Sequence, residues 1–273
     1  MTFKEFWQPL TARYDEGEAQ WIGRLVMEVY HGLSTSDIIM GKTGQIDEQV
    51  LLDQQQRLLK GEPVQYVVGK ADFGEHLFMV GPSVLIPRPE TLWLCKAVEE
   101  SIGIMPRSVL DIGTGSGCIA ITIALDRPTA SVTGWDISSD ALNIARMNAQ
   151  RQQADVTFER QDALHLPHHK QMWDAIVSNP PYICQQERAS MEQHVVDFEP
   201  ALALFVPDDD PLLFYRSIAR YAIDALTPEG RLYFEINPLY AEALGDLLLD
   251  IGFSQVRICQ DDFGKNRYII AEF

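Results

Sequence analysis

A glycine-rich turn between an apolar strand and a helix is the feature that most constrains the fold of this chain. The turn reads Gly-Thr-Gly-Ser-Gly over residues 113–117, after an apolar run at 108–112 and before an apolar helical stretch to residue 125. Glycine at positions 113 and 115 allows positive φ and lets a ligand approach the backbone without meeting a Cβ atom. This order of elements is typical of α/β folds that bind a nucleotide, although an ordinary tight connection can have the same composition.

Strands and helices alternate through the rest of the chain after residue 106. We expect strands at 108–112, 131–136, 156–161, 175–178, 231–236, 253–258 and 267–273, and helices at 117–125, 140–152, 211–226 and 239–251. Strands separated by helices of this length form a mostly parallel sheet that is covered on both faces. The short loop between the last two strands requires an antiparallel pair. The predicted fold class is therefore α/β, with a mostly parallel seven-stranded Rossmann-like sheet.

The first part of the chain has a different character. Apolar residues recur at helical spacing up to residue 62 and predict a small helical bundle. Short extended runs, punctuated by glycine, are expected at 64–69, 73–80 and 84–86, and they predict a β-hairpin linker. The stretch Pro-Arg-Pro-Glu-Thr at 87–91 then opens a helix to about residue 101. We therefore predict three parts, which are residues 1–62, 63–86 and 87–273.

The charge balance and the cysteine content argue against several classes of protein. The chain has 22 basic and 39 acidic residues, a formal net charge of -17 and no long basic run, which argues against a nucleic acid partner. The four cysteines lie far apart without a Cys-x-x-Cys pair, so neither a disulfide framework nor a zinc site is expected. No apolar run is long enough to span a bilayer, and no export signal is visible. We expect a monomeric, cytoplasmic protein without a membrane partner.

Two acidic residues follow strands at the same edge of the sheet as the glycine turn. Asp136 ends the second strand, about 20 residues beyond the turn, where a carboxylate can accept both hydroxyl hydrogens of a ribose. Asp162 follows the third strand and can accept from the exocyclic amine of an adenine, unless it only caps a helix or lies in a solvated loop. NAD and S-adenosylmethionine both carry these groups. Asp111 favours S-adenosylmethionine, because a carboxylate beside the turn would suit an ammonium group and repel a pyrophosphate.

The motif Asn-Pro-Pro-Tyr at residues 179–182 directly follows the apolar strand at 175–178. A planar amide nitrogen is a poor nucleophile because its lone pair is delocalised into the carbonyl. Asn179 can accept one N–H of such an amide through its side-chain oxygen, and the backbone carbonyl of Pro180 can accept the other. Tyr182 can lay its ring on the flat group. Two acceptors in a stiff proline turn would therefore orient a planar nitrogen toward an activated methyl group.

These motifs together resemble a known family. Asn-Pro-Pro-Tyr downstream of Asp-x-Gly-x-Gly-x-Gly is similar to amino-methyltransferases that act on planar nitrogens, which include adenine-N6 and protein-glutamine enzymes. Further stretches resemble the HemK/PrmC family, the release factor glutamine methyltransferases: Glu-Pro-Val-Gln-Tyr at 62–66, Val-Leu-Ile-Pro-Arg-Pro-Glu-Thr at 84–91, Phe-Glu-Pro-Ala-Leu-Ala-Leu at 198–204 and Asp-Phe-Gly-Lys-Asn-Arg at 262–267. The resemblance covers nearly the whole chain.

The resemblance implies methyl transfer from S-adenosylmethionine to the glutamine of a Gly-Gly-Gln motif in peptide chain release factors, which the N-terminal helices help to hold. It implies a catalytic role for Asn179, Pro180 and Tyr182. Together, motifs and resemblance assign the cofactor to Gly113, Thr114, Gly115, Ser116, Gly117, Asp136, Asp162, Ala163 and Asn179, and the substrate to Asn179, Pro180, Pro181, Tyr182 and Arg88. Glu90 and Thr91 would lie near the pocket or simply begin a helix.

Two positions depart from the family pattern, and neither belongs to the Asn-Pro-Pro-Tyr motif. Ala163 stands where some relatives have an aromatic residue beside the adenine, and Glu-Ile-Asn-Pro at 235–238 replaces an expected Glu-x-Gly run. No metal is expected. The histidines at 165, 168 and 169 lack a carboxylate or cysteine spaced to complete a site, and the aspartates at 208–210 suit a solvated loop.

Three other functions stay open from the sequence. An adenine-N6 methyltransferase acting on DNA or RNA could use the same four residues, although the acidic balance opposes it. An NAD-dependent oxidoreductase would leave residues 179–182 without a role. A catalytically silent protein that only binds the cofactor or a partner would not require them either, since a fold by itself does not guarantee activity.

Overall fold

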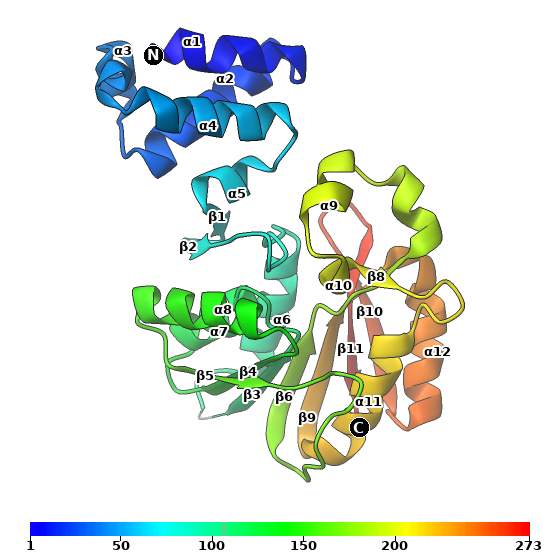
Figure 1. Ribbon diagram of the computed structural model, residues 1–273. Helices are drawn as coiled ribbons and strands as arrows, with labels where there is room; N and C mark the ends of the chain where they lie inside the picture. The colour runs from blue at the N-terminus through cyan, green and yellow to red at the C-terminus, as the bar shows by residue number, and fades with distance from the viewer. Residues whose placement is uncertain (106) are drawn as a thin grey trace.

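The computed structural model describes residues 1–105 and 107–273 (Figure 1). Its main sheet consists of β3 (Ser108–Ile112), β4 (Ser131–Asp136), β5 (Val156–Arg160), β6 (Trp173–Ser178), β9 (Leu226–Glu235), β10 (Gln255–Gln260) and β11 (Asn266–Glu272). The order across the sheet is β10-β11-β9-β6-β3-β4-β5. Neighbouring strands from β5 to β9 are parallel, and β11 is antiparallel to both β9 and β10. The predicted fold class is confirmed, including the antiparallel final pair.

Helices cover both faces of this sheet, as Figure 1 shows. On one face lie α6 (Thr91–Ile102), α7 (Cys118–Asp126) and α8 (Ser139–Gln152), and on the other lie α11 (Leu213–Ala225) and α12 (Ala241–Ile251). Successive strand residues point to opposite faces, so Val109 joins the core with α6 and α7 while Leu110 joins the core with α11 and α12. Burial on both faces explains why the central strands read as continuous apolar runs.

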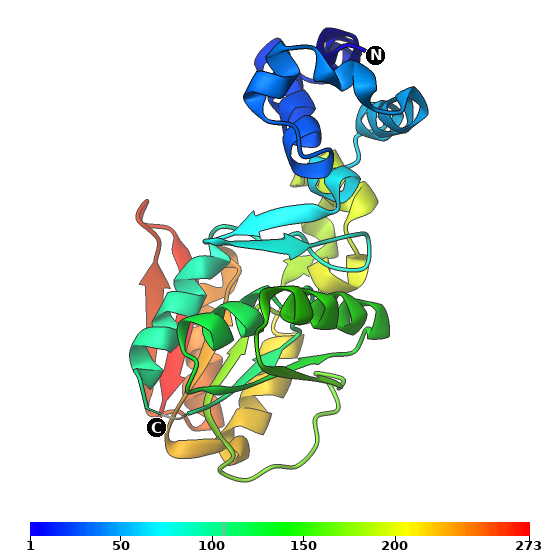
Figure 2. The same ribbon diagram turned by 90° about the vertical axis from the view of Figure 1, so that its left-hand side faces the viewer.

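The N-terminal helices form a bundle with its own core, as the helical spacing predicts. They are α1 (Phe3–Trp7), η1 (Gln8–Ala12), α2 (Glu16–Leu25), η2 (Val26–Tyr30), α3 (Thr35–Ile39), η3 (Lys42–Gln45) and α4 (Glu48–Leu59). Phe6, Leu10, Met27 and Leu58 are completely buried within it. Figure 2 shows this bundle standing apart from the sheet, with the hairpin described next between the two.

The linker contains the expected hairpin, but its beginning differs from the prediction. Strands β1 (Lys70–Phe73) and β2 (His76–Met79) pair antiparallel, whereas α5 (Val64–Val68) is a short helix that ends at Gly69 with φ of 71°. Val67 packs into the N-terminal core while Tyr66 packs into a small core under the hairpin. A short apolar run buried on all sides fits a helix as well as a strand, and the sequence cannot distinguish them.

The segment between β6 and α11 carries small elements that the sequence did not predict. They are β7 (Ile183–Cys184), η4 (Gln185–Ser190), α9 (Gln193–Phe198), α10 (Ala201–Leu204) and β8 (Phe205–Val206), and a further turn, η5 (Pro238–Tyr240), precedes α12. Strands β7 and β8 form a two-residue parallel pair. In Figure 1 this segment lies at the carboxyl ends of the sheet strands, the same end as the hairpin.

Asn148 of α8 ties the hairpin to the glycine turn. Its side chain is 1% exposed, its Oδ1 accepts from the backbone N–H of Met79 at 2.7 Å, and its Nδ2 donates to the carbonyl oxygen of Met79 at 3.0 Å. The same nitrogen donates to the carbonyl oxygen of Ser116 at 2.9 Å. One buried amide thus satisfies backbone groups of two segments that lie far apart in the sequence.

We expect Asn148→Ala to leave these backbone groups buried without partners. Each such group costs about 1–3 kcal/mol, so the free energy of unfolding should fall by at least about 2 kcal/mol in a denaturant titration. Asn143→Ala, an exposed change on the same helix, is the matched control and should alter stability by less than about 0.5 kcal/mol. Equal stability of the two variants would show that Asn148 does not hold the hairpin.

Candidate active site

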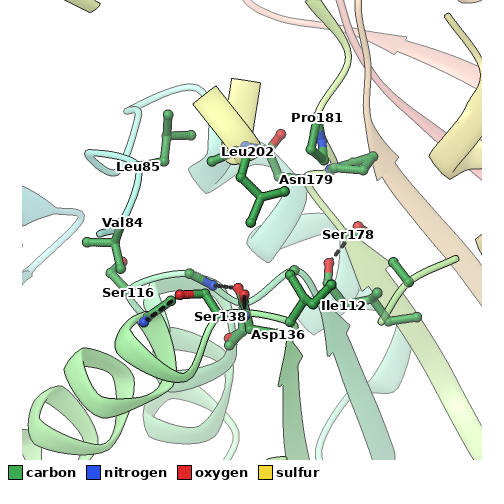
Figure 3. Close-up of a pocket in the computed structure, with 18 of the residues that line it drawn as sticks. Val84, Leu85, Ile112, Ser116, Asp136, Ser138, Ser178, Asn179, Pro181 and Leu202 are labelled. Carbon is green, nitrogen blue, oxygen red and sulfur yellow. Dashed lines mark hydrogen bonds between the residues drawn. The ribbon is translucent and has the colours of Figure 1, made fainter. Parts of the chain in front are cut away.

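A cavity of about 360 Å³ opens at the carboxyl ends of β3, β4 and β6. The strand order reverses at β3, and ligands of open α/β sheets bind at such a point. Figure 3 shows the strand ends on one side of the cavity, with Val84 and Leu85 of the segment after the hairpin and Leu202 of α10 on the other. A largely apolar enclosure with a few polar groups is the usual form of a small-molecule site.

The glycine turn forms part of the cavity wall. Gly113 and Gly115 have φ of 78° and 56°, in the left-handed region that favours glycine. A Cβ atom at Gly113 would meet nothing within 4 Å, and one at Gly115 would meet only a carbonyl oxygen at 4.0 Å. The backbone N–H groups of Gly113 and Thr114 donate to the carbonyl oxygen of Trp135 at 2.8 and 2.9 Å, which holds the turn against β4. The backbone is therefore open to a ligand at these two glycines.

Asp136 lies beside the turn with both carboxylate oxygens anchored. Oδ2 accepts from the backbone N–H of Gly115 at 2.9 Å and Oδ1 from that of Ser138 at 2.8 Å, as seen in part in Figure 3. Burial raises the pKa of this carboxyl above its usual range. Each oxygen retains a lone pair for a further hydrogen, so the carboxylate can accept from two neighbouring hydroxyls.

Asp162 and Ala163 line the same cavity in the loop after β5. The carboxylate of Asp162 accepts from the backbone N–H of Leu164 at 2.9 Å and contacts Nδ1 of His165 at 2.8 Å. The hydrogen bond with His165 is the main cause that lowers the pKa of Asp162. Asp162 thus stabilises its own loop and also faces the cavity, so its position is compatible both with a loop-capping role and with a contact to a ligand.

A second cavity of about 500 Å³ adjoins the first. The two share Leu85, Arg88, Asn179 and Ala203 in their walls. Pro180 and Pro181 face the first cavity, and Tyr182 faces the second. The Asn-Pro-Pro-Tyr motif therefore lies where the two spaces meet. Just before it, the Ser178 hydroxyl donates to the carbonyl oxygen of Ile112 at 2.6 Å and fixes the end of β6 to β3 (Figure 3).

Arg88 is held in the wall of both cavities by Glu199. Their Nη2 and Oε1 atoms are 2.5 Å apart, and the Glu199 side chain is 0% exposed. The other Glu199 oxygen accepts from the backbone N–H of Ile86 at 3.2 Å. One buried carboxylate thus joins the segment after the hairpin to the segment between α9 and α10.

Two residues of the glycine motif lie away from the cavity. Gly117 begins α7, where a Cβ atom would be 2.9 Å from the Ile121 side chain and 3.2 Å from that of Ala145, so close packing requires glycine there. Asp111 is fully buried below the turn and accepts from the Thr114 hydroxyl at 2.7 Å. Its position does not support the suggested contact with a ligand ammonium group.

Several residues of the site were not assigned from the sequence. Leu85, Leu202 and Glu199 belong to this group, and so does Glu235, which is 7% exposed and faces the second cavity. An acidic residue at the carboxyl end of an apolar strand was the signal that identified Asp136, and Glu235 carries the same signal. The two leucines belong to the stretches at 84–91 and 198–204 that resemble the family, but the sequence gives them no role in the site, because only the folded chain brings them over the sheet.

No metal site is found among residues 1–105 and 107–273, since no group of three or more His, Cys, Asp or Glu side chains there could hold an ion. His169 instead contacts the Tyr221 hydroxyl at 2.8 Å through Nδ1 and packs against Trp135. None of the described helices combines the length and apolar composition that crossing a bilayer requires.

Known proteins with similar sequences identify the family of this chain. Residues 91–198 match the family described as the methyltransferase small domain. The release factor glutamine methyltransferase of Bacteroides thetaiotaomicron is 43% identical over 97% of this chain and 96% of its own length. Proteins of the same name from Flavobacterium psychrophilum and Streptococcus pneumoniae are each 37% identical, over 98% and 99% of this chain and 97% and 96% of their own lengths.

A solved structure with the same fold is the catalytic domain of hMettl16, in complex with MAT2A 3'UTR hairpin 6. It superposes with a TM-score of 0.58 over 72% of this chain and 75% of that chain. The two sequences are 18% identical, so the likeness shows a common fold.

Asp111 should make stability depend on pH, because burial raises its pKa to about 7. Between about pH 4 and pH 7 the folded protein then keeps a proton that the unfolded chain has released. The free energy of unfolding falls as the pH rises through this window, by up to about 4 kcal/mol for this group. Asp111→Asn stays neutral, so its stability relative to the parent should increase between pH 4 and pH 7 in denaturant titrations. A difference that is constant with pH would contradict the assignment.

Proposed function

Because this chain belongs to the release factor glutamine methyltransferase family, we propose that it methylates the side-chain amide nitrogen of the glutamine in the Gly-Gly-Gln motif of peptide chain release factors. The methyl donor is S-adenosylmethionine. The observation that carries the proposal is the position of Asn179, in the walls of both cavities. A donor in one cavity and an amide in the other would meet at this residue.

The first cavity fits S-adenosylmethionine. The carboxylate of Asp136 offers two acceptors for the ribose hydroxyls, and Asp162 offers one for the adenine amine. Ala163 leaves room beside the base, and the open backbone at Gly113 and Gly115 accommodates the amino-acid part. Thr114, Ser116 and Asn179 complete the proposed contacts, whereas Gly117 acts through packing. When bound, the cofactor supplies an electrophilic methyl group on a sulfonium that leaves as a neutral thioether.

The Asn-Pro-Pro-Tyr motif would activate the glutamine by orientation. The side-chain oxygen of Asn179 accepts one N–H of the glutamine amide, and the Pro180 carbonyl oxygen accepts the other. Pro181 stiffens the turn, and the Tyr182 ring packs against the flat amide. Orientation of this kind supplies up to roughly 7–11 kcal/mol of barrier reduction, so no strong base is required and the proton leaves after transfer.

The remaining parts of the chain fit a protein substrate. Residues 1–62 stand apart from the sheet with their own core, which suits a domain that holds a macromolecule, and 63–86 would connect it to the catalytic part at 87–273 (Figure 2). Arg88 would contact the substrate in the second cavity. The net charge of -17 supports a protein over a nucleic acid partner. We propose that the enzyme acts as a cytoplasmic monomer.

The direct test is transfer of label from S-adenosylmethionine to a purified release factor. A release factor with the Gly-Gly-Gln glutamine replaced by alanine is the control. We expect label on the first and none on the second. Label on both would place the modification elsewhere, and label on DNA or RNA alone would assign the chain to the adenine-N6 methyltransferases.

Asp136→Ala should weaken cofactor binding. It removes the carboxylate beside the glycine turn that can accept from two hydroxyls, so the Kd for S-adenosylmethionine should rise about tenfold or more in calorimetry. The exposed Asn143→Ala serves as control and should bind as the parent does. An unchanged Kd in Asp136→Ala would remove this residue from the cofactor site.

Asn179→Ala should remove one of the two acceptors that orient the amide nitrogen. Loss of a single oriented hydrogen-bonding group in an active site costs about 10²–10³-fold in kcat, and this variant should lose at least that much while it keeps the unfolding midpoint of the parent. Methyl transfer at the parent rate by folded Asn179→Ala would exclude the mechanism.

A further inference from the structure

A buried carboxylate that the mechanism above does not use lies beside the Asn-Pro-Pro-Tyr motif. Glu235 is the last residue of β9, and the register pairs Ser178 at the end of β6 with Phe234. Asn179, the residue after β6, therefore lies beside Glu235, the last residue of β9. Glu235 is 7% exposed and lines the second cavity with Asn179 and Tyr182.

Two hydroxyl groups donate to this carboxylate. The Thr91 hydroxyl donates to Oε2 at 2.6 Å and the Tyr182 hydroxyl to Oε1 at 3.3 Å. Burial raises the pKa of Tyr182, so its hydroxyl stays protonated and donates. Within the described residues no basic side chain forms an ion pair with Glu235, since the neighbouring Arg267 pairs with Asp261 and Glu90 instead. Burial raises the pKa of Glu235, and the hydrogen bonds from Thr91 and Tyr182 oppose this rise. The two hydroxyls therefore offset part of the cost of a buried carboxylate that has no paired cation.

The first of these bonds determines how Asn179 is turned. A threonine hydroxyl has a single hydrogen, and Thr91 donates this hydrogen to Glu235. Toward Asn179, Oγ1 of Thr91 can therefore act only as an acceptor. Nδ2 of Asn179 lies 3.5 Å from this oxygen, a long hydrogen bond such as often occurs in active sites without a ligand. The nitrogen of the amide then faces Thr91 and its oxygen faces the other way. An amide has nearly the same shape in both orientations, so hydrogen bonding selects between them.

We infer that Glu235 and Thr91 are positioning residues, which act through Asn179 and Tyr182 to present the side-chain oxygen of Asn179 to the substrate amide and to hold the Tyr182 ring. This inference rests on the proposed function. If the side-chain amide of Asn179 were reversed, its N–H groups would face the N–H groups of the substrate amide, and no hydrogen bond could form between them. Loss of the arrangement should therefore lower kcat more than it changes binding of either ligand.

The Thr91 hydroxyl can be tested with a pair of variants. Thr91→Val keeps the shape and removes the hydroxyl, and it should lower kcat about 10–100-fold while KM for the release factor and Kd for S-adenosylmethionine change less than about threefold. Thr91→Ser keeps the hydroxyl and should restore kcat to within about threefold of the parent. If Thr91 had only a structural role, packing of its methyl group would matter most. Thr91→Ser, which lacks this methyl group, would then have the lower kcat of the two variants.

The matched control is Thr122→Val on α7. Thr122 is 4% exposed, and its hydroxyl has no partner among the residues that the structure describes. The same chemical change at this buried site should leave kcat at the parent value. If Thr91→Val matches Thr122→Val in kcat, the inference is wrong.

Glu235→Gln tests the other end of the chain of hydrogen bonds. The neutral amide has one oxygen and one NH2 group, so it cannot accept from Thr91 and Tyr182 with two separate oxygens. We expect a loss of kcat comparable to that of Thr91→Val, and the double variant should lose little more than the larger single loss because both residues act through Asn179. Losses that multiply would mean that the two residues act independently.

The two levels of the proposal fail in different ways. If the parent enzyme labels the Gly-Gly-Gln glutamine but the Thr91 and Glu235 variants keep its kcat, only the positioning role is wrong. If the parent transfers no label to the release factor, the proposed function fails, and the positioning role fails with it.

Discussion

The parallel pairing of β3 with β4 and β6 is the constraint on which the site depends. Parallel strands end at the same edge of a sheet, so Asp136 at the end of β4, Asn179 after β6 and Glu235 at the end of β9 are brought together although they are far apart in the sequence. The glycine turn after β3 lies between them and opens the backbone toward the cavity. Each residue is placed by its strand, and burial of the sheet on both faces makes these positions rigid.

Several of the polar groups at this edge are carboxylates or carbonyl oxygens, which act as acceptors. Asp136, Asp162 and Glu235 are carboxylates, and the Asn179 side chain and the Pro180 carbonyl add neutral oxygens. Such a lining suits ligands that bring N–H and O–H groups and a positive charge, as a ribose, an adenine amine, a primary amide and a sulfonium do. It would disfavour a pyrophosphate. The guanidinium of Arg88, which lies in the wall of both cavities, is already paired with Glu199.

The second side of the site is built from an irregular stretch, residues 84–88, and from short elements that include α9 and α10. Residues 84–88 and the α9–α10 segment face the sheet edge and are joined through the buried Glu199, while Asn148 fixes the hairpin to the glycine turn. Irregular segments satisfy few of their own backbone groups, so they depend on such buried side chains for a defined position. Methyl transfer requires atoms to be placed closely, and these polar anchors provide that order where secondary structure does not.

Local patterns in the sequence determined the alternation of strands and helices, the glycine turn and the Asn-Pro-Pro-Tyr motif, because each is a property of neighbouring residues. Strand β3 was predicted with the bounds it has. The tertiary structure decided the rest. The apolar run of α5 is buried as a short helix, Asp111 is buried below the turn, and Gly117 packs against α7 and α8. Leu85 and Leu202 line the cavity, and Glu199 holds Arg88 in its wall. The hydrogen bond between Thr91 and Glu235 joins residues that are far apart in the chain, so no local sequence pattern could predict it.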